Sequence, residues 1–85
     1  MLSVVTVLGR TGPKSDDETR IIEVRRAYNE DKRTPTIDMI KVVLWSRNKS
    51  APFYRVEAGN LVALKGRLEV VNGELIVVAE QVNFV

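Results

Sequence analysis

Apolar and polar residues alternate along much of the chain, and this period of two residues is the pattern that predicts β-strands. The alternation is most regular between residues 37 and 45, where Ile40, Val42 and Leu44 form an uninterrupted aliphatic row. Because successive side chains of a strand point to opposite faces, this row is expected to line the core. The same reasoning predicts strands over residues 3–8, 20–28, 37–45, 61–71 and 74–84.

The segment between the third and fourth predicted strands breaks this alternation and predicts a short helix over residues 51–58. Ser50 has a side chain suited to an N-cap, and Pro52 falls in the first turn, where proline is tolerated. Gly59 is suited to the position just after the helix. The chain is therefore expected to hold one short helix among its strands.

Glycines near the end of the chain predict how the last two strands meet. Asn72-Gly73 lies between valine-rich arms, and this dipeptide favours a tight type I′ hairpin turn. Gly66 interrupts the fourth predicted strand and indicates a bulge or a sharp bend, as small closed barrels require. Three strands, a short helix and two more strands is the order of the OB-fold, a five-stranded Greek-key barrel. Residues 1–85 are therefore predicted to form one all-β OB-fold domain with a short helix between strands 3 and 4.

The other row of the third predicted strand is unusual for a face that only meets water. It holds Met39, Lys41, Val43 and Trp45, whereas a solvated face would carry mainly polar residues. An outward aromatic ring beside a cation suits a flat, negatively charged partner, and single-stranded nucleic acid is the clearest example. Trp45 could instead pack against the helix around Phe53 or fill a dimer interface, and Lys41 could be an ordinary solvated charge.

Composition excludes several functional classes. The 13 basic and 11 acidic residues leave a net charge of only +2, so attraction for phosphate must come from local clustering. Cys and His are absent, which removes the thiolate nucleophile, the imidazole base and the usual zinc ligands. The acidic run Asp16-Asp17-Glu18 is disfavoured as a metal site, because consecutive loop residues converge poorly on one ion. We therefore expect a protein that is not an enzyme and that uses no metal or cofactor.

The sequence gives no sign of export or membrane insertion. The N-terminus lacks the charged region and the long apolar run of a signal peptide. No apolar stretch approaches the roughly 20 residues that span a bilayer. A soluble cytoplasmic protein is expected, and the absence of Cys fits a reducing compartment.

Four segments of the chain share features with the strands of a known family. Residues 4–10 end in Gly-Arg, and residues 40–47 end in an aromatic residue, a small residue and a cation. Residues 59–68 end in Gly-Arg-Leu, and residues 78–84 supply a closing strand. Taken in this order, the segments resemble the bacterial single-stranded DNA-binding protein family, and the resemblance covers nearly the whole chain.

This resemblance implies an OB-fold that assembles through its first strands into a homodimer or homotetramer. It also implies cofactor-free, largely sequence-independent binding of single-stranded DNA, in an accessory role in replication, recombination or repair. By position, Trp45 corresponds to a base-stacking aromatic, Lys41 and Arg47 correspond to phosphate-contacting cations, and Met39 falls where the family often has another aromatic. The short Asn72-Gly73 turn and the absence of the family's acidic-tipped tail imply a minimal variant that binds DNA more weakly. Such a variant would be closer to the primosomal replication protein N branch.

Residues outside the third strand complete the predicted binding surface. Arg10 follows the first strand, and Lys32 and Arg33 lie in the connection between strands 2 and 3, where an OB-fold binds oligonucleotides. These three charges could equally be solvated, and Tyr28 could either stack on a base or pack at the end of the barrel. The predicted nucleic-acid-binding residues are Arg10, Tyr28, Lys32, Arg33, Met39, Lys41, Trp45 and Arg47.

Two alternatives stay open from the sequence. RNA could replace DNA, because base stacking does not distinguish them without a contact to the 2′-hydroxyl group. The chain could also be a protein-interaction module of a replication or primosome complex, with weak or no DNA binding. In that case Met39, Val43 and Trp45 would form an apolar docking patch, since Trp and Met are enriched in interface cores.

Overall fold

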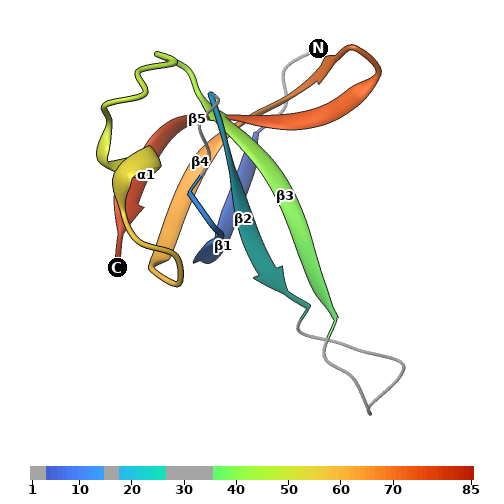
Figure 1. Ribbon diagram of the computed structural model, residues 1–85. Helices are drawn as coiled ribbons and strands as arrows, with labels where there is room; N and C mark the ends of the chain where they lie inside the picture. Colours follow the sequence, from blue (N-terminus) through green and yellow to red (C-terminus); the bar gives the residue numbers. More distant parts are fainter. Residues whose placement is uncertain (1–3, 15–17, 27–35) are drawn as a thin grey trace.

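Five strands form a closed barrel in the computed structural model, which describes residues 4–14, 18–26 and 36–85 (Figure 1). The strands follow the order β1-β2-β3-β5-β4 around the barrel, and every neighbouring pair is antiparallel except β3 and β5. The elements are β1 (Val5–Thr11), β2 (Thr19–Arg25), β3 (Ile37–Leu44), α1 (Pro52–Arg55), β4 (Leu61–Val71) and β5 (Glu74–Phe84). This order, with the helix between β3 and β4, is that of an OB-fold, so the predicted fold class is confirmed.

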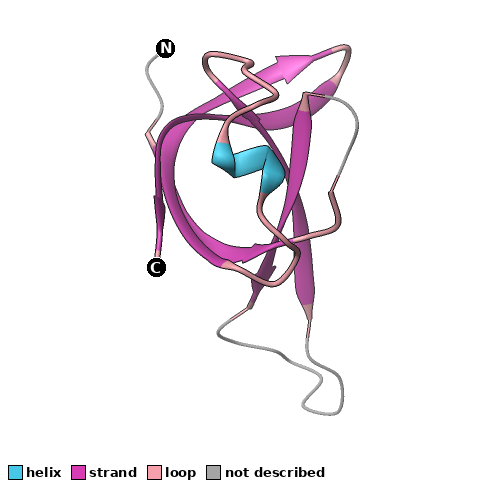
Figure 2. Cartoon of the chain, turned by 60° about the vertical axis from the view of Figure 1, so that its left-hand side comes forward, coloured by secondary structure: helices cyan, strands magenta, loops and turns pink. Residues whose placement is uncertain are grey.

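The core fills the inside of the barrel, and α1 lies across the opening in the ring of strands (Figure 2). The predicted row of β3 points inward, because Val42 and Leu44 are buried and Ile40 packs against them from a partly buried position. Phe53 and Tyr54 of α1 meet edge to face, with ring centroids 5.1 Å apart, and are buried in the same cluster. The helix and every strand thus contribute apolar side chains to one continuous core.

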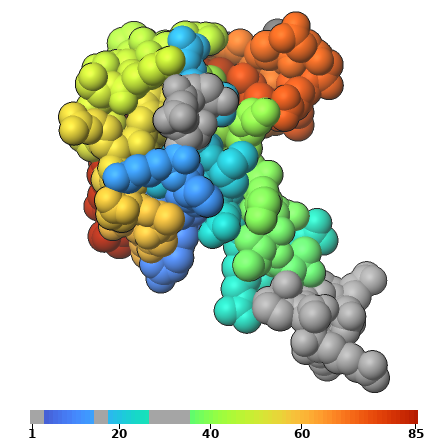
Figure 3. Space-filling model, viewed as in Figure 1, coloured from blue at the N-terminus to red at the C-terminus, as the bar shows by residue number. Residues whose placement is uncertain are grey.

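Gly66 allows β4 to bend where it passes β5. The register of the two strands shifts between Lys65 and Gly66, which confirms the predicted bulge. A Cβ atom at this position would lie 1.9 Å from the carbonyl oxygen of Val78, so another residue fits only if the backbone moves. Beyond the bulge, residues 69–76 pair only with each other among the described residues. This segment, here called the β4–β5 hairpin, projects from the barrel as a lobe of orange atoms in Figure 3.

The turn of the hairpin has the predicted conformation. Asn72 has a φ of 52° and Gly73 a φ of 79°. Positive φ at both central residues is the mark of a type I′ turn, whose twist matches that of the flanking strands. The two glycines of β4 and its turn therefore set the shape of the hairpin.

The helix is shorter than the sequence pattern predicts. The pattern predicts residues 51–58, but α1 spans only Pro52–Arg55. Ser50 is not the N-cap, which was a wrong prediction: Ala51 occupies that position without a side-chain cap bond, and the N–H of Ser50 donates to the side chain of Asn48. Within the described ranges, no helix has the length and apolar character needed to cross a bilayer.

The end of the helix also differs from the prediction. Val56 already has an extended backbone, so the helix has ended before Gly59, whose φ of 91° belongs to the turn into β4. The physical reason is that the carbonyl groups of Phe53 and Tyr54 accept hydrogen bonds from Arg20 instead of from a further helical turn. A tertiary contact, which the local sequence does not show, therefore limits α1 to four residues.

The limits of the first three strands differ from the predicted ones, and β1 and β2 begin at Val5 and Thr19. β1 continues past residue 8, because Arg10 and Thr11 form ladder pairs with β2. β3 ends one residue early, at Leu44, and β2 ends at Arg25. Residues 27 and 28, which the pattern also assigns to the second strand, lie outside the described residues. The limits of β4 and β5 are as predicted.

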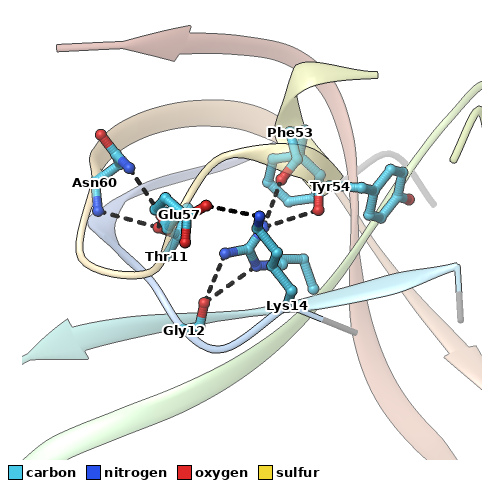
Figure 4. A network of polar contacts seen from close by, with 8 residues as sticks. Thr11, Gly12, Lys14, Phe53, Tyr54, Glu57 and Asn60 are labelled. Carbon is cyan, nitrogen blue, oxygen red and sulfur yellow. Dashed lines mark hydrogen bonds and ion pairs between the residues drawn. The ribbon is translucent and has the colours of Figure 1, made fainter. Parts of the chain in front are cut away.

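Arg20 is buried although it carries a positive charge, and it lies on the core face of β2 with Ile22. Its guanidinium group donates to the carbonyl oxygen of Gly12 at 2.7 and 3.2 Å, and to those of Phe53 and Tyr54 at 3.3 and 3.0 Å. Burial lowers the pKa of the guanidinium group, although arginine stays protonated at physiological pH. These bonds tie the connection after β1 to α1, and Figure 4 shows the acceptors Gly12, Phe53 and Tyr54 gathered together.

Glu57 and Thr11 extend this network to the segment that follows the helix (Figure 4). The Nζ atom of Lys14 lies 2.8 Å from a carboxylate oxygen of Glu57, and this hydrogen bond lowers the pKa of the Glu57 carboxyl group. The hydroxyl group of Thr11 donates to the carbonyl oxygen of Glu57 and accepts from the N–H of Asn60. The segment after α1 is thereby fastened to the end of β1.

Candidate nucleic-acid interface

Trp45 lies in a tight turn directly after β3, and its side chain is 65% exposed. The backbone N–H of Trp45 donates to the carbonyl oxygen of Ala79 on β5 at 3.0 Å. The backbone N–H of Arg47 donates to the carbonyl oxygen of Leu44, also at 3.0 Å. Arg47 has a φ of 55°, a left-handed conformation in which the chain reverses direction. The backbone around Trp45 is therefore fixed, while the indole ring lies outside the core that contains Phe53, as the outward-facing prediction requires.

The hydroxyl group of Tyr54 holds this turn from the inside. It accepts a hydrogen bond from the N–H of Leu44 at 2.8 Å and donates one to the carbonyl oxygen of Glu18. The ring of Tyr54 is buried in the core. One buried side chain thus joins α1, the last residue of β3 and the residue that precedes β2.

Removing this hydroxyl group in Tyr54→Phe is expected to lower the free energy of unfolding by about 1–3 kcal/mol, because the buried N–H of Leu44 loses its acceptor. Urea denaturation followed by circular dichroism measures the change. The amide hydrogen of Leu44 should also exchange faster, because the turn opens more often. A free energy within about 0.5 kcal/mol of the parent protein, as for an ordinary surface change, would contradict this role.

Lys41 and Arg47 lie on the walls of one hollow between β3 and the β4–β5 hairpin, which we call the hairpin hollow. It has a volume of about 190 Å³. Nζ of Lys41 lies 3.0 Å from Glu74, and Nη1 of Arg47 lies 3.3 Å from Glu18. The structure therefore brings both predicted phosphate contacts to one hollow, and each is already paired with a carboxylate that also lines this hollow.

Val43 does not belong to the exposed surface, and this part of the prediction was wrong. It is only 2% exposed and packs with Ile76 and Val78 in a second, smaller core cluster. The reason is the parallel pairing of β3 with β5, which sets Val43 opposite Val78 at the base of the hairpin. The predicted docking patch of Met39, Val43 and Trp45 therefore loses its middle residue.

Met39 and Arg10 are exposed but lie away from this turn. Met39 is 70% exposed and comes six residues before Trp45, a distance of about 20 Å along an extended strand. Nη1 of Arg10 donates to the carbonyl oxygen of Gly59 at 2.9 Å. Arg10 lines a separate groove of about 390 Å³ on the outer face of β1 and β2. The structure thus separates Arg10 from the hairpin hollow, whereas Met39 lines a neighbouring hollow that shares Lys41, Glu74 and Ile76 with it.

Tyr28, Lys32 and Arg33 lie outside the described residues, so their assigned roles stay predictions. At the edge of the described part, Arg26 and Asp38 form a bidentate ion pair with a shortest distance of 2.9 Å. The hydrogen bond from Arg26 lowers the pKa of the Asp38 carboxyl group and raises that of the guanidinium group. This basic side chain therefore already has an acidic partner.

Sequence reasoning missed Glu18 and Glu74 as partners of the predicted cations. Neither residue is near its partner in the sequence, and Glu74 reaches Lys41 only because the hairpin returns along β3. The burial of Arg20 was also missed, although a signal existed: it shares the inward alternation of Ile22 and Val24 on β2.

Within the residues that the structure describes, no group of three His, Cys, Asp or Glu side chains is placed to hold a metal ion. Asp16 and Asp17 of the acidic run lie outside those residues. The third member of the run, Glu18, forms an ion pair with Arg47.

No protein-family model matches the chain, and no curated protein matches its sequence. Among solved structures, the chain is similar to the dimeric N-terminal domain of the PriB protein from Thermoanaerobacter tencongensis. The match covers 96% of this chain and 94% of that chain, with a TM-score of 0.60 and 22% sequence identity. This agreement over nearly the full length of both chains supports the OB-fold described above.

Proposed function

We propose that this protein binds single-stranded nucleic acid, with single-stranded DNA as the preferred partner, and that it does so without catalysis or a cofactor. The observation that carries the proposal is Trp45, an aromatic ring that is 65% exposed on a backbone bonded to β5. A ring on a fixed backbone loses little freedom when a base stacks on it, so most of the stacking energy contributes to affinity. Lys41 and Arg47 on the walls of the hairpin hollow supply charge for phosphate groups.

Two likenesses support the choice of DNA. The sequence resembles the bacterial single-stranded DNA-binding protein family around Trp45 and in three other segments. The fold is similar to that of the N-terminal domain of PriB. On these grounds we propose an accessory role in DNA replication, recombination or repair.

The direct test is a titration of the protein with an oligo-dT of about 16 nucleotides, the upper end of the site sizes of OB-folds, while the fluorescence of Trp45 is followed. We expect quenching of the fluorescence. Affinity should fall with salt with a log–log slope of at most about 1.4, since each of two cations neutralises one phosphate at about 0.7 each. Between about 50 and 200 mM salt, that limit corresponds to about a sevenfold loss. Absence of quenching at low salt would contradict the proposal.

The same titration with oligo-rU of equal length separates DNA from RNA. The proposal expects tighter binding of oligo-dT, because the resemblance is to a DNA-binding family. Equal or tighter binding of oligo-rU would replace DNA by RNA as the partner, since the 2′-hydroxyl group would then be tolerated or used.

A second candidate function is a protein-interaction module of a replication or primosome complex. It is favoured by exposed apolar side chains on β3, β4 and β5, where Met39, Leu68 and Leu75 are 70%, 40% and 61% exposed. They border a hollow of about 310 Å³. Replacing Lys41 and Arg47 with alanine separates the candidates: loss of DNA binding supports the first, while unchanged DNA binding together with loss of a protein partner supports the second.

We also propose that the protein is a homodimer or homotetramer. Residues 5–8 of β1 pair with β4, and within the described residues they form no ladder pair with β2, so one edge of this segment is open. An open strand edge can pair with the same strand of a second copy. Sedimentation equilibrium measures the mass in solution, and a monomer at all concentrations would contradict this part of the proposal.

A further inference from the structure

We propose that Glu18 and Glu74 compete with nucleic-acid phosphate for Arg47 and Lys41, and that this competition sets the affinity of the site. The inference rests on the proposed function, and it assigns a role to two acidic residues that the sequence alone does not connect with binding. Both carboxylates line the hairpin hollow together with the two cations. They come from different parts of the fold, one from the start of β2 and the other from the hairpin turn.

Both ion pairs, Lys41–Glu74 and Arg47–Glu18, have the geometry of exposed contacts that can dissociate. The shortest distances are 3.0 Å for Lys41–Glu74 and 3.3 Å for Arg47–Glu18, and the side chains are between 36% and 57% exposed. Exposed ion pairs contribute little to stability and are screened by salt, so opening them does not unfold the protein. A phosphate group can therefore take the place of either carboxylate on its cation.

The exchange has a cost for binding because the carboxylate stays nearby. Glu74 follows the type I′ turn and is fixed by its backbone beside Lys41, and Glu18 is held by the bond from Tyr54 to its carbonyl group. Once displaced, each carboxylate still repels the phosphate that replaced it. The hairpin hollow therefore presents two cations whose charge is largely cancelled before nucleic acid arrives, and binding is weaker than the cations alone would make it.

The floor of the hairpin hollow adds a second element to the site. Val43 and Ile76 line it and are buried, so the hollow joins an apolar base to charged walls. Such a surface suits the apolar face of a base or sugar between two phosphate groups. The carboxylates are therefore placed where an incoming phosphate must pass, and not on a remote part of the barrel.

The experiment compares Glu18→Gln, Glu74→Gln and the double variant with the parent protein, using a dye-labelled oligo-dT and fluorescence anisotropy. Each single change should tighten binding about threefold and the double change about tenfold, which lies within the range of exposed ion pairs. The salt slope should steepen by up to about 0.7 for each cation set free. Glu57→Gln is the matched control, because it changes the net charge equally but removes a partner of Lys14 outside the hollow.

The control should tighten binding by less than about twofold, since only the screened long-range charge changes. If the parent protein binds but Glu18→Gln and Glu74→Gln bind no tighter than Glu57→Gln, the competition is refuted and the proposed function stands. If no variant binds oligo-dT at low salt, the double variant included, both proposals fail. Binding by the double variant alone would support the competition in its strongest form. Thermal melting of each variant confirms that folded proteins are compared.

Discussion

Replacing Trp45 with alanine is expected to weaken binding of single-stranded DNA by about 5- to 150-fold, the equivalent of about 1–3 kcal/mol for one lost base–aromatic stack. The fold should be unaffected, because the side chain is 65% exposed and its backbone bonds to Ala79 do not depend on the ring. A large loss of affinity at constant stability would identify the ring itself as the binding element. No other described side chain combines an aromatic ring with comparable exposure.

Anisotropy of a dye-labelled oligo-dT measures this effect without relying on tryptophan fluorescence. Trp45→Phe should retain most of the affinity, since it keeps a stacking ring at the same place. Ile37→Ala is the matched control for loss of an exposed apolar side chain, because Ile37 is 50% exposed at the start of β3 and lines the separate groove of Arg10. Equal affinities for the parent and Trp45→Ala would overturn the assignment of this ring, and a loss in Ile37→Ala alone would move the site to the groove of Arg10.

Replacing Arg20 with methionine should lower the free energy of unfolding by about 3 kcal/mol or more, because three buried carbonyl groups lose their hydrogen-bond donor. Methionine fills similar space but donates no hydrogen bond, so the carbonyl groups of Gly12, Phe53 and Tyr54 lose the guanidinium donor. Each buried acceptor left without a partner costs about 1–3 kcal/mol. Since natural domains are stable by only about 5–15 kcal/mol, the loss would be a large part of the total.

Urea denaturation at constant pH measures the loss, and Arg55→Met is the control. Arg55 is exposed and belongs to α1, the helix that Arg20 contacts. Its replacement removes an equal charge without breaking buried hydrogen bonds. We expect a change of less than about 0.5 kcal/mol for this control. If both variants lost the same stability, the contribution of Arg20 would be its charge and not its hydrogen bonds.

The parts of the fold that the sequence predicts correctly are those set by local chemistry. The limits of β4 and β5, the bulge at Gly66 and the turn at Asn72-Gly73 depend on alternation and on glycine, and all can be read over a few residues. The helix limits were wrong because α1 ends at a contact with Arg20, which lies more than 30 residues earlier. The sequence around the helix does not identify such a distant partner.

In the candidate site, too, the sequence predicts the local features but not those that depend on distant strands. The outward position of Trp45 follows from the period of β3, and the structure confirms that exposure. The burial of Val43 does not follow from it, because the face of a strand is decided by whatever element covers it, here β5. The partners of Lys41 and Arg47 depend on the same long-range pairing, so sequence reasoning finds the cations but not the carboxylates that hold them.

The ladder between β1 and β4 has a consequence for how the chain reaches its native state. It pairs Val5 with Gly66 and Arg10 with Leu61, so the barrel closes through contacts between residues more than 50 positions apart. Barrels dominated by such distant pairings fold in milliseconds to seconds, whereas a hairpin forms in microseconds. We therefore expect the β4–β5 hairpin to form early and the β1 strand to join last. During synthesis, the N-terminal strand must wait until β4 has left the ribosome before it finds its neighbour.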